Sequence, residues 1–74
     1  NLENGENQRA ARHYQKALFY RPRFKEAWNN LGVAQLYLGN KAKALTCFQK
    51  ALQVDPNYAE ARKNLEVLNK GQKR

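Results

Sequence analysis

His13 and Cys47 are the two side chains of this 74-residue sequence that could form a nucleophile with its general base. A thiol is activated when an imidazole within hydrogen-bond reach takes its proton. These two residues are 34 positions apart, which is also the period of an internal repeat described below. Side chains at equivalent positions of stacked units lie at least one helix-packing distance apart, about 8–10 Å. We therefore expect surface or half-buried residues with no catalytic or ligand role.

Other catalytic, metal and cofactor sites find no support in the residue types. The chain contains no serine, so a serine triad is impossible. Its six acidic residues are scattered along the chain, and with a single histidine they do not compose a metal site. The four glycines form no phosphate-binding motif, and Gly32 is better explained by close helix packing. We expect no enzyme, no cofactor and, because no run approaches the roughly 20 apolar residues of a spanning helix, no membrane insertion.

The basic residues suggest a different chemistry, the binding of a polyanion. The formal net charge is +8 and the pI is near 10, which favours RNA or another acidic partner. A predicted convex column would contain Arg9, Arg12 and Lys16, then Lys43 and Lys50 one unit later, with Arg21, Arg23 and Lys25 beside them. The alternative interpretation is the solvated face of amphipathic helices, since Phe19 is the one aromatic residue that accompanies the column. The single cysteine fits a reducing compartment such as the cytoplasm.

The positions of these residues follow from an internal repeat. Shifting the sequence by 34 residues without a gap aligns Gly5 with Gly39, Ala10 with Ala44, Tyr14 with Phe48, 15–18 with 49–52, Pro22 with Pro56, Phe24 with Tyr58, 26–27 with 60–61, and 30–31 with 64–65. A period of this length indicates stacked supersecondary units that bury their apolar faces against one another.

Each unit is predicted to contain two helices. Apolar residues recur at helical spacing, and the predicted helices cover residues 7–20, 24–38, 41–54 and 58–70. Gly39 can end a helix in the left-handed conformation, and Asn40 can cap the next helix. Pro56 ends the predicted helix 41–54, because proline cannot continue a helix. No stretch alternates with period two, so the fold class is all-α, a right-handed solenoid of antiparallel helix pairs.

The residues from 28 to 56 resemble the tetratricopeptide repeat. The signature residues of that family stand at the right spacing in Trp28, Leu31-Gly32, Ala44, Phe48, Ala51 and Pro56. The signature tyrosine is replaced by Gln35, with Tyr37 close by. The resemblance implies a module that binds proteins or peptides and has no catalytic activity.

The resemblance also predicts how the chain is organised. We expect a single domain over 1–74, with a partial repeat at 1–23, a complete repeat at 24–57 and a C-terminal capping helix and tail at 58–74. Arg62 and Glu66 stand where the next unit should have Trp and Gly, and they are four apart and could pair on the surface. Residues 1–4 match the end of an earlier first helix, so we expect the C-terminal portion of a longer array.

In this family the first helix of each unit lines a concave groove that holds extended peptides. By position, the predicted peptide-binding residues are Glu26, Asn29, Asn30, Val33, Tyr37, Glu60, Lys63, Asn64 and Val67. Asn30 and Asn64 are one period apart, and both side chains are expected to face solvent in the free protein. An amide can hold a peptide group because it both donates and accepts. A clamp for a C-terminal carboxylate is not expected, since Glu60 and Asn64 replace the cations of that clamp.

Three functions therefore remain open: a peptide in the groove, a polyanion on the basic column, or a purely architectural segment. Self-association is a further expectation. The N-terminal edge carries Tyr14, Leu18, Phe19 and Tyr20 on a helix that lacks most of its covering neighbour, and such edges are adhesive.

Overall fold

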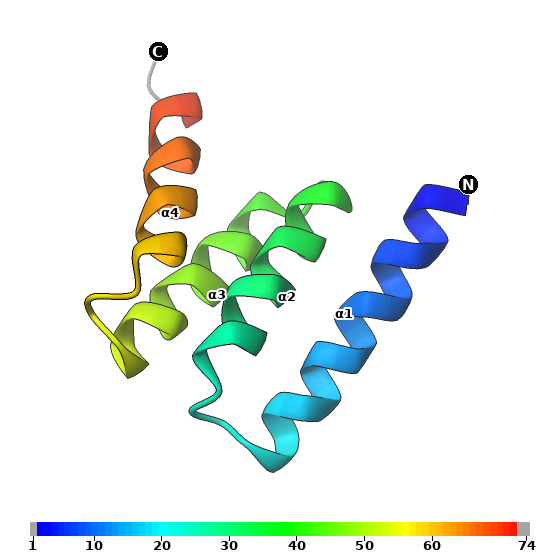
Figure 1. Ribbon diagram of the computed structural model, residues 1–74. Coiled ribbons are helices and arrows are strands. Elements are labelled where there is room, and N and C mark those ends of the chain that lie inside the picture. The colour runs from blue at the N-terminus through cyan, green and yellow to red at the C-terminus, as the bar shows by residue number, and fades with distance from the viewer. Residues whose placement is uncertain (1, 73–74) are drawn as a thin grey trace.

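The structure is a computed structural model that describes residues 2–72, with the side chains of residues 5–70. Over this range it consists of four helices without a strand: α1 (Leu2–Tyr20), α2 (Lys25–Tyr37), α3 (Lys41–Val54) and α4 (Ala59–Gln72). Successive helices run in opposite directions, and α2 packs against both α1 and α3 while α4 packs on α3 (Figure 1). The prediction of an all-α repeat of antiparallel helix pairs is confirmed.

The two loops that join one unit to the next have the same construction. In the first loop the backbone N–H of Phe24 donates to the carbonyl of Arg21 (3.1 Å), and in the second Tyr58 donates to Asp55 (3.0 Å). Proline follows the first residue of each loop and cannot continue the preceding helix. The indole of Trp28 also donates to the carbonyl of Pro22 (2.8 Å) and so holds the first loop against α2.

The turn between α2 and α3 is closed by a glycine in the left-handed region, Gly39, with φ of 84°. The N–H of Gly39 donates to Leu36, and the N–H of Asn40 donates to Gln35 (2.8 Å), which is the Schellman pattern. The expected side-chain cap by Asn40 is wrong. Its amide instead donates to the side chain of Gln35 (2.9 Å), so the residue braces the turn rather than the next helix.

The first helix is longer than the sequence predicted. We expected residues 2–4 to end a separate helix, but α1 continues through Gly5. The equivalent glycine, Gly39, reverses the chain with the help of the Asn40–Gln35 hydrogen bond. Glu6 stands at the position of Asn40 and has no amide donor, so that bond cannot form. The helix therefore propagates, at the modest cost of one internal glycine.

The core has two parts, and Phe48 is the largest side chain enclosed in it, with 0% of its surface exposed. One part joins α1, α2 and Cys47 of α3 through alanine and leucine side chains. The other part surrounds Phe48 with Ala44 of α3, Leu68 of α4 and half-buried residues of α2. Alanines contribute most of the fully buried positions, which lets the helix axes approach closely.

Gly32 of α2 lies directly against the ring of Phe48. A Cβ atom built at Gly32 would lie 2.5 Å from the nearest ring carbon, closer than any real contact allows. The ring cannot move aside, since it is fully buried. The packing role that the sequence suggested for Gly32 is therefore confirmed.

A pair of glycine substitutions tests this contact. Gly32→Ala should lower the free energy of unfolding by roughly 1–2 kcal/mol, because overpacking costs about 1–3 kcal/mol and the better helix propensity returns only part of it. Gly5→Ala is the matched control. It lies inside α1 with nothing within 4 Å of its Cβ, so it should gain about 0.5–1 kcal/mol. Thermal unfolding followed by circular dichroism measures both, and a Gly32→Ala melt equal to the Gly5→Ala melt would refute the contact.

Candidate interaction surface

The predicted peptide-binding residues divide into three groups by exposure and by hydrogen bonding. Six are exposed: Glu26, Asn30 and Tyr37 on α2, and Glu60, Lys63 and Val67 on α4. Two large apolar side chains among them are conspicuous, since Tyr37 and Val67 are 69% and 67% exposed. Val33 is half-buried and packs against the cluster around Phe48. The remaining two residues form a pair with a structural role.

That pair is Asn29 with Asn64. The side chain of Asn29 is only 4% exposed, and its Oδ1 accepts a hydrogen bond of 2.9 Å from Nδ2 of Asn64. The expectation that Asn29 lies open in the groove is wrong. The expectation that Asn30 and Asn64 are equivalent solvent-facing amides is also wrong, because Asn64 is half-buried and bonded while Asn30 is exposed. The bond instead joins α2 to α4. Its two residues are 35 positions apart, one more than the period of the repeat, so they are not equivalent.

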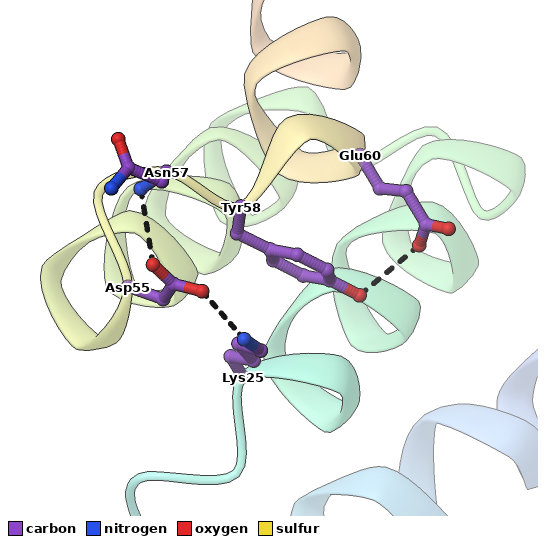
Figure 2. Close-up of polar contacts among 5 residues, drawn as sticks. All are labelled: Lys25, Asp55, Asn57, Tyr58 and Glu60. Atoms are coloured by element: carbon purple, nitrogen blue, oxygen red, sulfur yellow. Dashed lines mark hydrogen bonds and ion pairs between the residues drawn. The ribbon is translucent and has the colours of Figure 1, made fainter.

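A polar cluster fixes the start of α4 beside the start of α2 (Figure 2). Lys25 of α2 donates to the carboxylate of Asp55 at 2.5 Å, and the other oxygen of Asp55 accepts from the backbone N–H of Asn57 at 3.1 Å. Lys25 also lies 5.1 Å from the ring centroid of Tyr58, whose hydroxyl donates to Glu60. Lys25, which the sequence placed beside the predicted basic column, is thus engaged in an ion pair between the start of α2 and the second loop.

Electrostatics in this cluster follow from these bonds. The hydrogen bond from Lys25, followed by that from Asn57, holds the pKa of Asp55 below its usual range. The same hydrogen bond raises the pKa of Lys25. Burial, followed by the hydrogen bond to Glu60, raises the pKa of Tyr58 to about 12. The ion pair is therefore present at neutral pH and is lost as the pH falls through the lowered pKa of Asp55.

The basic residues proposed for polyanion binding are exposed. Arg9, Arg12 and Lys16 lie on α1, and Lys43 and Lys50 lie on α3. Phe19 is 79% exposed, and its ring packs edge-on against that of Tyr20. Arg21 lies over the ring of Phe24, with 5.7 Å to its centroid. Exposure is common to polyanion binding and to a solvated outer face, so polyanion binding stays a prediction.

The helix α4 carries charges at the two positions where α2 has Trp28 and Gly32. Arg62 and Glu66 are both exposed and line a broad surface groove of about 470 Å³ with Leu52 and Leu65. Among residues 5–70 no ion pair joins Arg62 to Glu66, contrary to our expectation. An acidic residue four positions before a basic one is the favourable helical order, and here the order is reversed.

Cys47 and His13 lie in different environments. The thiol is buried, which corrects the expectation of a surface or half-buried cysteine, and His13 is exposed. Burial raises the pKa of Cys47 to about 11, so the neutral thiol prevails at neutral pH. Within the described part of the chain, no group of three or more His, Cys, Asp or Glu residues could hold a metal ion. None of the described helices is long and apolar enough to cross a membrane.

Stacked antiparallel helix pairs with a repeated sequence define a class, the α-helical repeat proteins. Residues 26–58 match the family model of the tetratricopeptide repeat, which supports that family for this helical repeat. No curated protein matches the chain significantly. Tetratricopeptide repeats generally mediate protein–protein interaction, and the family is typically non-enzymatic.

The two equivalent asparagines give a matched test of the α2–α4 link. Asn64→Ala should lower the free energy of unfolding by about 1 kcal/mol or more, because it leaves the buried carbonyl oxygen of Asn29 without its donor. Asn30→Ala removes the same side chain from an exposed position and should change it by less than about 0.5 kcal/mol. Urea unfolding compares the two variants, and equal losses would contradict a role for the bond.

Cys47 offers a test of burial by its reactivity. A pKa raised from 9.0 to about 11 reduces the thiolate fraction about a hundredfold at mildly alkaline pH. Alkylation by iodoacetamide should therefore be at least tenfold slower in the native chain than in denaturant. Because the folded state keeps the thiol proton to higher pH than the unfolded state, stability should also fall as the pH rises from about 9 to 11. Equal alkylation rates would disprove the buried thiol.

Proposed function

We propose that this protein is an interaction module that holds a peptide or protein segment on the concave face formed by α2 and α4. The observation that carries the proposal is the exposure of Tyr37 on α2 and of Val67 on α4, since large exposed apolar side chains rimmed by polar ones mark interaction sites. Exposed Glu26, Asn30, Glu60 and Lys63 supply the polar surroundings.

Each part of this face has a distinct role in the proposal. Tyr37 supplies a rigid aromatic contact that loses little entropy on binding, and Val67 extends the apolar surface on α4. Asn30 holds the backbone of the bound segment, because its amide can donate and accept. The charges of Glu26, Glu60 and Lys63 select side chains of the partner. Asn29 and Asn64 act differently from the other residues, since their hydrogen bond fixes α4 relative to α2 and so sets the shape of the face.

The organisation of the chain is part of the proposal. We place α1 as the second helix of a partial repeat at 1–23, and α2 with α3 as the complete repeat at 24–57. In the segment 58–74, α4 acts as the capping helix, because Arg62 and Glu66 keep its outer side solvated. All four helices form one domain in this scheme, and the peptide crosses the two first-type helices, α2 and α4.

Two exposed tyrosines make a matched test of the binding face. A peptide selected from a display library against the full chain is titrated against variants by fluorescence anisotropy. Tyr37→Ala should weaken binding roughly fivefold or more, which corresponds to about 1 kcal/mol. Tyr20→Ala should change it by less than about twofold, because Tyr20 is 71% exposed but lies on α1, outside the face. If the two substitutions have equal effects, the face is assigned wrongly.

A further inference from the structure

A groove lies between α1 and α3, with α2 as its floor. In the described part of the chain, α1 and α3 both pack on α2 but not on each other, which leaves this space between them. The α1–α3 groove has a volume of about 360 Å³, and its lining consists of Gln15 of α1, Leu31 and Gln35 of α2, and Ala42, Lys43, Thr46 and Cys47 of α3. None of these residues belongs to the concave face formed by α2 and α4.

The walls of the α1–α3 groove are open because of the geometry of the repeat. On α3, Thr46 and Gln53 are exposed although both α2 and α4 pack on that helix. Their equivalents one period earlier, Arg12 and Phe19, are likewise exposed on α1. This side of a second-type helix therefore faces solvent even where helices of the repeat pack on both of its neighbouring sides.

The floor of the α1–α3 groove holds a buried amide with an unused donor. Gln35 stands at the position of the signature tyrosine of the repeat and is only 6% exposed. Its Oε1 accepts the hydrogen bond from Asn40 (2.9 Å), while its Nε2 makes no hydrogen bond within the described residues. No enclosed side-chain nitrogen or oxygen in that range lacks a partner, so Nε2 keeps some accessible surface. Its two hydrogens are available to an acceptor on a ligand in the groove.

The groups around this amide combine apolar walls with further polar atoms. Leu31, Ala42 and Cys47 supply the apolar surface, and the cysteine acts there as a small apolar group. The hydroxyl of Thr46 donates to the carbonyl of Ala42 (3.2 Å), which leaves the hydroxyl oxygen able to accept. Such a lining matches a flat ring with apolar faces and with donors and acceptors on its edge. A nucleobase is a ring of this kind.

Cations stand around the α1–α3 groove, and no acidic residue lines it. Lys43 is itself part of the lining. Lys50 lies four residues after Thr46 on α3, and Arg12 lies three residues before Gln15 on α1, so both share the groove side of their helices. All three cations are exposed. They would neutralise the phosphates of a chain that runs along the groove.

An exposed aromatic ring extends the α1 wall. Phe19 lies one helical turn after Gln15 on the same side of α1, and 79% of it is exposed. Proteins that bind single strands stack successive bases on such rings, whereas an acidic protein segment has no group that needs one. A flat lipid surface cannot reach Gln35 at the floor, and the bases of a double helix are already stacked inside it. The ring and the floor therefore favour a single strand.

We propose that the α1–α3 groove binds single-stranded nucleic acid. One base lies in the groove with an acceptor on its edge towards Nε2 of Gln35, and a neighbouring base stacks on Phe19. The phosphates run past Arg12, Lys43 and Lys50. This inference goes beyond the proposed function, because it assigns a second site that shares no residue with the concave face and takes a different class of ligand.

The probe for this site is a short fluorescein-labelled oligouridylate, titrated against the full chain by fluorescence anisotropy. The logarithm of the affinity should fall with the logarithm of the salt concentration with a slope of about −2, because each of three cations contributes about −0.7 for a single strand. Lys43→Ala should weaken binding roughly threefold or more and flatten the slope by about 0.7. Lys70→Ala, the same loss of charge at an exposed position of α4, should have less than about a twofold effect.

Two further substitutions test the ring and the floor. Phe19→Leu keeps an apolar side chain but removes the aromatic face, so it should weaken binding roughly fivefold or more, while Phe19→Tyr should stay within about twofold. Gln35→Glu keeps an oxygen for Asn40 but replaces the Nε2 donor by an acceptor, and it should weaken binding roughly fivefold or more. Circular dichroism checks that each variant folds.

A measurement on the unmodified chain completes the test. The oligonucleotide should shift the side-chain amide signals of Gln35 in an NMR titration and leave the backbone amides of α4 in place. The proposal is overturned if the oligonucleotide does not bind at low salt, if these signals do not move, or if Lys70→Ala weakens binding as much as Lys43→Ala. Normal binding by Phe19→Leu also overturns it, as does equally tight binding of an oligoglutamate peptide or of a duplex. Peptide binding on the concave face should not change in Lys43→Ala, so each of the two proposals can fail alone.

Discussion

The contact between Gly32 and Phe48 determines how the other helices can pack. With no side chain on Gly32, the ring of Phe48 lies directly on the backbone of α2 and is fully buried there. Leu68 of α4 belongs to the same buried cluster as this ring, so α4 packs on α3. In this arrangement Asn64 of α4 donates to Asn29 of α2, and Lys25 of α2 donates to Asp55 in the second loop. The shape of the α2–α4 face thus depends on the absence of one methyl group.

The sequence predicted the helices and the closest contact but not the polar links between repeats. A 34-residue offset identifies equivalent residues, and the sequence located the loops and the packing role of Gly32 correctly. Polar contacts between the helices and loops, however, join residues that are not equivalent: Asn29 and Asn64 are 35 apart in successive repeats, and Lys25 and Asp55 are 30 apart within one repeat. Such pairs depend on the angles at which the helices pack, and periodicity carries no information about those angles. For this reason Asn64 was grouped with Asn30, and Lys25 with the surface cations.

Equivalent residues also behaved differently where their neighbours differ. Gly39 reverses the chain while Gly5 continues a helix, because Asn40 provides an amide for Gln35 and Glu6 does not. Cys47 is buried while its equivalent His13 is exposed, because α2 covers one and not the other. Local residue preference therefore predicts which positions can adopt a turn or be buried. Whether such a position forms the turn or is buried depends on the residues and helices next to it.

This dependence on neighbours makes the two sides of the repeat chemically unequal. On the α4 side, the positions that pack in α2 hold Arg62 and Glu66, whose charges would lose their hydration if a helix covered them. On the α1 side, Ala10, His13, Tyr14 and Ala17 stand at the positions of buried residues of α3, and they lose little on burial. A helix approaching from the α1 side gains apolar contact, while one approaching from the α4 side must first displace two charged side chains. The direction in which helices can be added thus follows from substitutions at two positions of one repeat.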